Sequence, residues 1–288
     1  MTVVRTPEEL EPAQRAVAIG TFDGVHLGHR RVLDAARAAG LRSTVVTFDP
    51  HPRIVLGQPV ELLATLERRL ELLEAAGIDD VLVLRFDDEL RAMPAETFAE
   101  DVLRAIGAEV VAAGQGFRFG NRRAGDLDLL ARLGFDVRAV PVVEGYSSST
   151  VRALLHAGEV ERAAAILGRP PEADGIVVHG EGRGRLLGFP TANLESIPNL
   201  LVPALGIYAG AVLGHRSAIS VGTNPTYGGT ERHVEAHLLD FDGDLYGQRL
   251  VVELWQRLRD EAAFASEGEL IAAIERDVGA TRLAVRPA

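Results

Sequence analysis

Two patterns of apolar and polar residues divide the chain near its middle. In the first half, short apolar runs typical of buried strands alternate with segments in which apolar residues recur every three or four positions. The expected strands are 17–19, 44–48, 81–84, 110–113 and 137–143, and the expected helices are 27–39, 62–76, 95–106 and 127–133. This alternation predicts βαβ units and a Rossmann-like α/β domain with a parallel sheet. In such sheets, ligands bind at the carboxyl ends of the strands.

The pattern changes after a further expected helix at 159–167. Residues 168–175 are rich in Gly and Pro and indicate a linker. Beyond them, turn residues separate short expected strands at 176–179, 207–213, 218–222, 234–241 and 250–258, and one helix is expected at 267–276. These features predict an antiparallel β-barrel or sandwich with a C-terminal helix. We therefore expect two domains, residues 1–168 and 169–288.

Composition narrows the chemistry. The 288-residue chain has no Cys, and all 30 of its basic residues are Arg because it contains no Lys. This excludes a thiol nucleophile, a Schiff-base lysine and a Walker-type phosphate-binding lysine. Any phosphate must be held by Arg, His, backbone N–H groups or a metal ion. The net charge of −11 does not suit binding to nucleic acid or to an anionic membrane. With neither a signal pattern nor a long apolar run, we expect a cytoplasmic protein.

The turn after the first expected strand is the strongest candidate for a phosphate site. Its glycines allow backbone N–H groups to approach a ligand closely, and the start of a helix adds a partial positive charge. His26 and His29 are three residues apart, so near a helix start they lie on one face. A solvated or capping histidine is the alternative for each. We expect ATP contacts from Gly20, Phe22, Asp23, Gly24, His26 and His29.

Three later stretches of the first half also carry polar residues where strands end or a helix begins. Two prolines stiffen 50–52 and are expected to hold His51 and Arg53 outward, although this could be a rigid turn only. The loop 114–126 suits a phosphate beside a flat ring, with Phe117, Arg118 and Phe119 as candidates, or is a mobile basic loop. Hydroxyls at 147–150 signal a helix N-cap and also an anion site.

The second half has two candidate features. The glycines of 180–185, together with two arginines, can wrap a nucleotide phosphate; a flexible hairpin is the alternative. The expected contacts are Gly180, Gly182, Arg183, Gly184 and Arg185. Thr191 and Asn193 face one side of an extended segment and offer oxygen ligands suited to Mg²⁺. Further along, His233, Glu235 and His237 alternate with apolar residues, which also fits a strand with a solvated polar face.

Both halves resemble known families. Asp23-Gly24-Val25-His26-Leu27-Gly28-His29 resembles the His-x-Gly-His signature of nucleotidyltransferases, in the form carried by bacterial FAD synthetases. Pro50-His51-Pro52 and Ser147-Ser148-Ser149-Thr150-Val151-Arg152 are similar to segments of the same enzymes. Pro190-Thr191-Ala192-Asn193, Gly222-Thr223-Asn224-Pro225-Thr226 and Val234-Glu235-Ala236-His237 resemble the riboflavin kinase domain. The whole chain is thus similar to bacterial bifunctional riboflavin kinase/FMN adenylyltransferases.

This resemblance implies two reactions. Riboflavin would be phosphorylated by ATP with Glu235 as general base and Mg²⁺ held by Thr191 and Asn193. FMN would then be adenylylated by ATP to FAD, with His26, His29 and Arg152 as catalytic residues and flavin contacts from His51, Phe117, Arg118 and Phe119. The same resemblance implies ATP contacts from Ser149, Thr150 and Arg152. Homo-oligomers are possible. Two rival hypotheses remain: another small-molecule nucleotidyltransferase fused to a β-module, and a non-catalytic flavin or nucleotide sensor.

Overall fold

The computed structural model describes residues 1–180, 182–223 and 232–287. The chain forms two compact units. The first unit comprises Met1–Val60 and Leu66–Tyr146, and the second comprises Glu61–Thr65 and Ser147–Ala288. Helices α7 (Ser148–His156) and α8 (Val160–Leu167) therefore group with the second unit, whereas the sequence-based boundary placed them in the first domain. In the part of the chain that is described, no helix is both long and apolar enough to cross a membrane.

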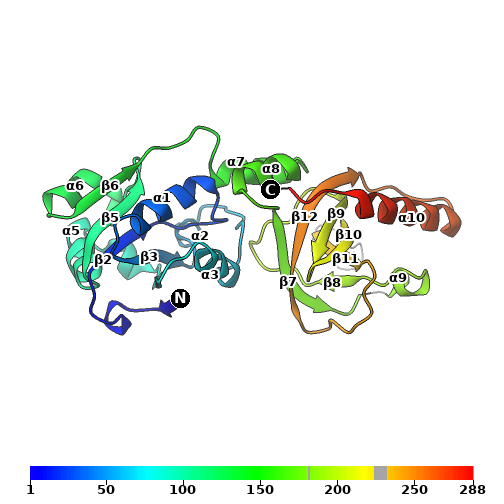
Figure 1. Ribbon diagram of the computed structural model, residues 1–288, viewed down its shortest axis with the longest axis horizontal. Helices are drawn as coiled ribbons and strands as arrows, with labels where there is room; N and C mark the ends of the chain where they lie inside the picture. Colours follow the sequence, from blue (N-terminus) through cyan, green and yellow to red (C-terminus); the bar gives the residue numbers. More distant parts are fainter. Residues whose placement is uncertain (181, 224–231, 288) are drawn as a thin grey trace. The chain divides into compact units, whose positions relative to one another are not determined.

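The first unit is built on a parallel sheet (Figure 1). Its strands are β1 (Thr2–Val4), β2 (Arg15–Ile19), β3 (Arg42–Asp49), β4 (Asp80–Arg85), β5 (Ala108–Gly114) and β6 (Asp136–Val140). They lie in the order β1-β4-β3-β2-β5-β6, and every neighbouring pair is parallel. The chain builds outward from β2 to β3 and β4, then returns to the other side of β2 with β5. Loops after β2 and β5 therefore meet at the switch point where such sheets bind ligands.

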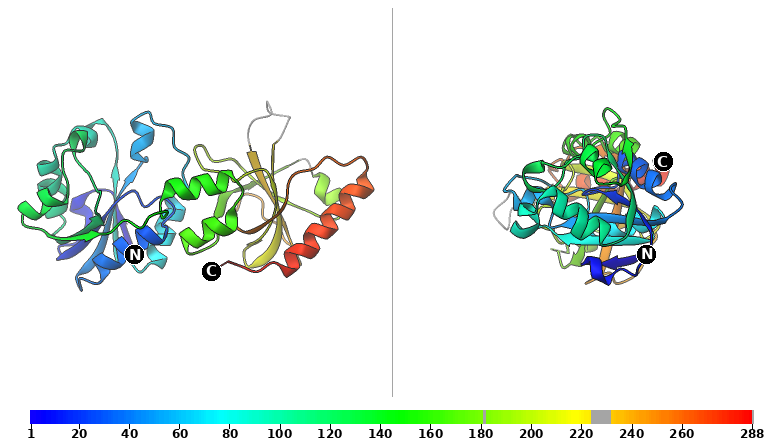
Figure 2. Two further views of the ribbon diagram at one scale, coloured as in Figure 1. Left: turned by 90° about the horizontal axis from the view of Figure 1, so that it is seen from above. Right: turned by 90° about the vertical axis from the view of Figure 1, so that its left-hand side faces the viewer.

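Helices cover both faces of this sheet (Figure 2, left). They are α1 (Leu27–Arg37), α2 (Pro52–Val55), α3 (Leu66–Ala75), α4 (Asp88–Ala92), α5 (Ala95–Phe98) with its π-helical continuation η2 (Ala99–Arg104), and α6 (Leu127–Arg132), with the 3₁₀ turns η1 (Pro7–Glu9) and η3 (Asn121–Arg123). Side chains alternate across a strand, so β2 serves two cores. Val17 packs in the core that contains Phe98, and Ala18 packs in the core that contains Leu33 and Leu73. The predicted α/β architecture is confirmed.

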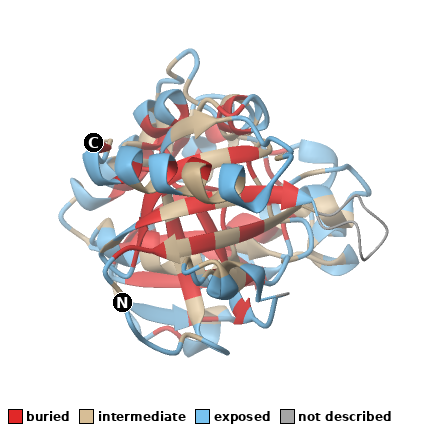
Figure 3. Ribbon diagram, turned by 90° about the vertical axis from the view of Figure 1, so that its right-hand side faces the viewer, coloured by how far each residue is buried: buried red, intermediate tan, exposed pale blue. Residues whose placement is uncertain are grey.

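The second unit is a closed antiparallel barrel, which decides between the barrel and the sandwich that the sequence allowed. Its elements after α7 and α8 are β7 (Glu172–Val178), α9 (Arg183–Leu186), β8 (Ala192–Leu194), β9 (Gly206–Val212), β10 (His215–Thr223), β11 (Arg232–Leu238), β12 (Arg249–Arg259) and α10 (Glu267–Leu283). The strands close in the order β10-β11-β8-β7-β12-β9. Figure 3 shows this unit's strands largely buried or half-buried. Helix α10 packs against β9 and β10.

Two sequence-based expectations about the second unit's edges are wrong. The expected linker 168–175 is cut short, because β7 begins at Glu172 and pairs with β12. Its Asp174 forms a bidentate ion pair with Arg249 at 2.8 Å, which fixes the strand start. The expected helix 62–76 begins only at Leu66. The preceding residues are not helical, and Leu62 forms a parallel bridge with Leu200 of the barrel unit.

Candidate active sites

The turn between β2 and α1 brings two predicted histidines together at the carboxyl end of an interior strand. His26 is the N-cap of α1, and its Nδ1 accepts a hydrogen bond from the backbone N–H of His29 at 3.2 Å. Because Nδ1 is the acceptor, the proton of a neutral His26 ring lies on Nε2. The two imidazole rings stack with their centroids 3.6 Å apart. Both rings thus belong to one cluster at the start of the helix.

The backbone of this turn is held in an uncommon conformation. Gly20 directly follows β2, Phe22 has φ 49° and Val25 has φ 39°. Non-glycine residues in this left-handed region are strained, and such residues cluster at functional sites because the surroundings must hold them there. Asp23 and Gly24 lie between them, with Asp23 buried. The predicted ATP contacts of this turn therefore sit on a backbone whose shape the fold imposes.

His29 is half-buried in the first turn of α1, and its contact with ATP stays a prediction. Burial, and to a smaller extent the charge of His26, hold the pKa of His29 well below its ordinary value. The ring is therefore neutral near pH 7 in the absence of a ligand. Its Nδ1 is buried and has no hydrogen-bond partner among the described residues. A buried nitrogen without a partner is costly, and a phosphate oxygen would satisfy it.

Gly28 explains why a glycine separates the two histidines. A Cβ at this position would lie 3.0 Å from both Cε1 and Nδ1 of His26 and 3.3 Å from the carbonyl oxygen of Tyr146. With a side chain at this position, the His26 ring would have to give way by a few tenths of an ångström. The glycine therefore leaves room for the ring that caps the helix.

The loop after β3 departs from its predicted arrangement. The expectation that both His51 and Arg53 point outward is wrong for His51, which is buried. His51 caps α2, where its Nδ1 accepts from the backbone N–H of Arg53 at 3.2 Å. Arg53 is exposed as expected. A flavin contact by His51 stays a prediction.

The three predicted flavin contacts in the loop after β5 differ in their exposure to solvent. Phe119 is buried and packs against Phe98 in the core at a centroid distance of 5.6 Å, so its predicted ligand contact conflicts with its position. Phe117 stacks on Phe119 and is half-buried, and Arg118 is exposed. Arg118 donates to Asp126 at 2.7 Å. Phe117 and Arg118 are the more accessible of the three, and their contact with a flavin stays a prediction.

The hydroxyls before α7 act as helix caps, one of the two roles the sequence allowed. The Ser147 hydroxyl accepts from the backbone N–H of Thr150 at 3.1 Å. Ser149 is exposed and Thr150 half-buried. Arg152 donates through Nε to the carbonyl oxygen of Glu61 at 2.5 Å. All four belong to the second unit, and their role as ATP contacts stays a prediction.

The barrel brings three predicted kinase residues together on two neighbouring strands. Antiparallel pairing of β8 with β11 sets Glu235 opposite Asn193. The Thr191 hydroxyl donates to Oε2 of Glu235 at 3.0 Å. The amide nitrogen of Asn193 lies 3.3 Å from the Thr191 hydroxyl. A carboxylate, a hydroxyl and an amide thus share one face of the barrel wall.

The glycine–arginine loop packs against this cluster. A Cβ on Gly180 would lie 2.7 Å from Cγ and Oδ1 of Asn193, so only glycine lets the loop come this close. Gly182 caps the short helix α9, which contains Arg183, Gly184 and Arg185. Both arginines are exposed. The loop predicted to hold phosphate and the residues predicted to hold metal are therefore adjacent.

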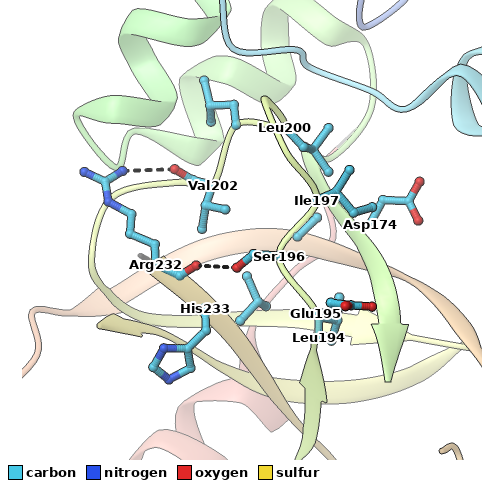
Figure 4. A pocket seen from close by; sticks show the side chains of 12 residues that line it. Asp174, Leu194, Glu195, Ser196, Ile197, Leu200, Val202, Arg232 and His233 are labelled. Carbon is cyan, nitrogen blue, oxygen red and sulfur yellow. Dashed lines mark hydrogen bonds between the residues drawn. The ribbon is translucent and has the colours of Figure 1, made fainter. Parts of the chain in front are cut away.

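The two histidines that flank Glu235 along β11 have different neighbours. His233 Nε2 lies 3.2 Å from Oε1 of Glu235, whereas His237 Nδ1 lies 2.8 Å from the carbonyl oxygen of Pro190. A small pocket adjoins the start of β11 (Figure 4). There Arg232 donates to the Val202 carbonyl, and Ser196 donates to the Arg232 carbonyl. Neither Thr191, Asn193 nor Glu235 lines this pocket.

Comparison with known proteins places both halves of the chain. The family model for FAD synthetase matches residues 8–152, and the model for riboflavin kinase matches residues 167–285. The chain is 37% identical to the bifunctional riboflavin kinase/FMN adenylyltransferase of Pseudomonas fluorescens over 100% of this chain and 99% of that protein. It is 36% identical to the Escherichia coli K12 protein of the same name, with 96% of each chain covered. The chain belongs to the bifunctional riboflavin kinase/FMN adenylyltransferase family.

One solved structure is similar over nearly the whole length. It is titled a macrolide-efflux protein from Streptococcus pneumoniae and is 30% identical, with a TM-score of 0.86 and coverage of 97% of this chain and 98% of that one. In the family assignment, the histidine turn falls within the FAD synthetase match, and the Thr191–Asn193–Glu235 cluster falls within the riboflavin kinase match. The family motif at Asn224, Pro225 and Thr226 lies outside the described residues.

The kinase cluster offers oxygen ligands of the kind that Mg²⁺ accepts. Thr191 and Asn193 offer a hydroxyl and an amide oxygen, which are hard ligands of the type Mg²⁺ accepts alongside phosphate oxygens. They lie beside the glycine–arginine loop, where nucleotide phosphates are expected. The amide nitrogen of Asn193 lies toward the oxygens of Thr191, which leaves the amide oxygen for a cation. The donor set therefore suits a metal carried in with the nucleotide.

Nothing in the sequence indicated that Arg69, near the histidine turn, is buried. Arg69 lies on α3 and donates to the carbonyl oxygens of Thr21 at 2.7 Å and Phe48 at 3.2 Å. Its neighbours in sequence, Leu-Glu-Arg-Arg-Leu-Glu, look like an ordinary helix with a charged outer face. Only the burial of Arg69 distinguishes it from Arg68, and burial is not visible in this pattern.

Proposed function

We propose that this chain makes FMN from riboflavin and ATP in its barrel unit, and FAD from FMN and a second ATP in its α/β unit. Family membership supports both activities, and the arrangement of side chains supports the division of labour. The net charge of −11 favours small-molecule substrates over nucleic acid or membrane surfaces. We place both reactions in the cytoplasm.

In the kinase reaction, Glu235 acts as general base. Its carboxylate accepts the proton of the ribityl terminal hydroxyl as that oxygen attacks the γ-phosphorus of ATP. The bond from the γ-phosphorus to the bridging oxygen breaks, and ADP leaves. Each carboxylate oxygen has two lone pairs, so Glu235 can accept this proton while Thr191 still donates to Oε2.

Thr191 and Asn193 would hold Mg²⁺, which when bound supplies positive charge to the phosphate oxygens. The Thr191 hydroxyl can offer its oxygen to a cation while it still donates its hydrogen to Glu235, so one residue would orient both groups. Gly180, Gly182 and Gly184, with Arg183 and Arg185, would surround the nucleotide phosphates. In this chain without Lys, Arg183 and Arg185 would supply the positive charge that a lysine supplies in Walker-type phosphate sites.

In the adenylyl transfer, an FMN phosphate oxygen attacks the α-phosphorus of ATP, and pyrophosphate leaves. This step requires no protein nucleophile. His26 and His29 donate hydrogen bonds to phosphate oxygens and stabilise the developing charge. The N-terminus of α1 adds its partial positive charge at the same place. Ser149, Thr150 and Arg152 are proposed further contacts to the phosphates of this ATP.

One observation carries the kinase assignment: the Thr191 hydroxyl lies 3.0 Å from Glu235. The direct test incubates the protein with riboflavin, ATP and Mg²⁺ and separates the products by chromatography. We expect FMN first and FAD later. Binding of flavin without either product would instead favour a sensor, and turnover of a non-flavin phosphate ester would favour another nucleotidyltransferase.

A further inference from the structure

Arg69 connects the two loops that leave the sheet beside its switch point. Its Nη1 donates to the Thr21 carbonyl in the turn after β2 and to the Phe48 carbonyl near the end of β3. The same nitrogen lies 3.4 Å from the Thr47 hydroxyl. One guanidinium therefore connects the start of the histidine turn to the carboxyl-terminal end of β3.

Arg69 is a buried positive charge with two carboxylates nearby. The residue is 4% exposed, and its Nε is buried without a hydrogen-bond partner in the ranges described. Burial lowers the pKa of Arg69, and the charges of Asp23 and Asp49 oppose that shift. Burying an arginine costs desolvation free energy, and apolar residues of similar volume often stabilise the folded protein at least as well. The burial of Arg69 therefore calls for a reason other than stability.

The turn that Arg69 holds needs external support. Phe22 and Val25 have left-handed backbone angles, and Arg69 contacts the carbonyl of Thr21 directly before this stretch. The same turn ends at His26, whose ring accepts the His29 amide. A shift at Thr21 is therefore passed through the strained turn to both imidazoles.

A second buried arginine offers a comparison at the opposite end of the same sheet. Arg15 begins β2, is 1% exposed and donates to the Ile106 carbonyl at 2.8 Å, with Asp80 3.5 Å from its Nε. Amino ends of parallel strands do not bind ligands in these sheets. The two residues thus match in type and burial but differ in which end of the sheet they support.

We propose that Arg69 is a positioning residue for adenylyl transfer, holding the histidine turn in the geometry that His26 and His29 need, whereas Arg15 serves stability alone. This inference rests on the proposed adenylyl transfer in the α/β unit. Misplacing catalytic groups by about 1 Å can cost about 10²-fold in rate. Loss of Arg69 should therefore lower the kcat for FAD formation more than it raises the KM for ATP.

The test uses Arg69→Met, Arg69→Lys and Arg15→Met in the full-length protein. FAD formation from supplied FMN and FMN formation from riboflavin are measured below the onset of thermal unfolding of each variant, with unfolding followed by circular dichroism. We expect Arg69→Met to lower the kcat of FAD formation by about 10–100-fold, Arg69→Lys to recover part of it, and both to keep wild-type FMN formation. Arg15→Met should lower the melting temperature and leave the kcat of FAD formation within about twofold.

Three results would overturn the inference. These are wild-type FAD kinetics in Arg69→Met, an equal loss of kcat in folded Arg15→Met, or, should Arg69→Met not fold, wild-type kinetics in Arg69→Lys. The proposed function fails separately, if the wild-type protein makes no FAD or if His29→Ala makes FAD normally.

Discussion

The two candidate sites are held in place in different ways. In the barrel, Glu235 and Asn193 face each other because β8 and β11 pair in a fixed register, and Thr191 reaches the carboxylate from one residue before β8. In the α/β unit, His26 and His29 depend on a turn with left-handed residues and on a helix cap. Backbone hydrogen bonds between β8 and β11 position the kinase cluster, whereas buried side chains hold the histidine turn.

This difference predicts how each site responds to change. A register shift in the barrel would have to break several backbone hydrogen bonds at once, so the kinase residues should tolerate changes that do not touch their side chains. The strained turn has no ladder of its own, so distant buried groups such as Arg69 become part of its support. Substitutions that separate the two reactions therefore test the contrast directly.

The largest effect should follow from removing the proposed base. Glu235→Gln keeps the shape of the side chain but cannot take a proton, so FMN formation should fall by about 10²–10⁴-fold. FAD formation from supplied FMN should stay unchanged. Glu253→Gln is a matched control, since Glu253 is also a barrel-strand glutamate, with a side chain 23% exposed against 32% for Glu235. Near-normal kinase turnover in Glu235→Gln would refute the assignment.

The corresponding change in the α/β unit is His29→Ala. Loss of a preorganised donor to the transferring phosphate should lower FAD formation by about 10²–10³-fold. FMN formation in the same preparation should be normal, because no residue of the turn belongs to the barrel unit. Product chromatography measures both activities in parallel. An equal loss of both would show that the two sites do not act separately.

The same contrast explains what could be predicted from the sequence. The alternation of 233–238 indicated that His233, Glu235 and His237 share a face, and the parallel sheet followed from the βα pattern. That Glu235 meets Thr191 came from resemblance, because strand pairing is a long-range property that alternation alone does not reveal. Strand β1 was missed because it is only three residues long.

Other features depend on tertiary contacts that no local pattern encodes. Residues 62–65 looked helical in sequence, yet Leu62 bridges to Leu200 and Thr65 donates to Asp174 at 2.6 Å. His51 looked exposed between two prolines but is buried as the cap of a short helix. Phe119 looked like a ring available to a flavin but completes a core with Phe98. In each case a partner far away in the sequence decided the outcome.

A smaller effect should follow from crowding the kinase cluster without removing any of its groups. Gly180→Ala places a Cβ against the amide of Asn193, which must turn or shift. We expect the kcat/KM of FMN formation to fall by about 10-fold, with FAD formation from FMN unchanged. Gly279→Ala in α10 is the control, since nothing lies within 4 Å of its added Cβ. A wild-type kcat/KM in Gly180→Ala would mean that the close contact between Gly180 and Asn193 does not contribute to the kinase reaction.

The smallest expected effect concerns pH and the folded state of the α/β unit. The pKa of His29 is lowered in the folded protein, mainly by burial, whereas in the unfolded chain it is near ~6.5. Between the two values the unfolded chain binds more protons, so stability rises with pH up to about 6.5 and falls as the solution is acidified below it. The slope from one such group is at most about 1.4 kcal/mol per pH unit.

His29→Asn removes this titration, so its unfolding free energy should depend less on pH below about 6.5 than that of the wild type. Denaturant unfolding at several pH values, monitored by circular dichroism, measures the difference. Saturating ATP should flatten the wild-type curve as well, because an anion beside the ring favours its protonated form and so raises the pKa of the folded state. If the wild type and His29→Asn show the same dependence, the ring is not shielded from water in the way its buried Nδ1 indicates. A curve that ATP leaves unchanged would place the nucleotide phosphates away from His29, and the proposed role of the stacked histidines would fail with it.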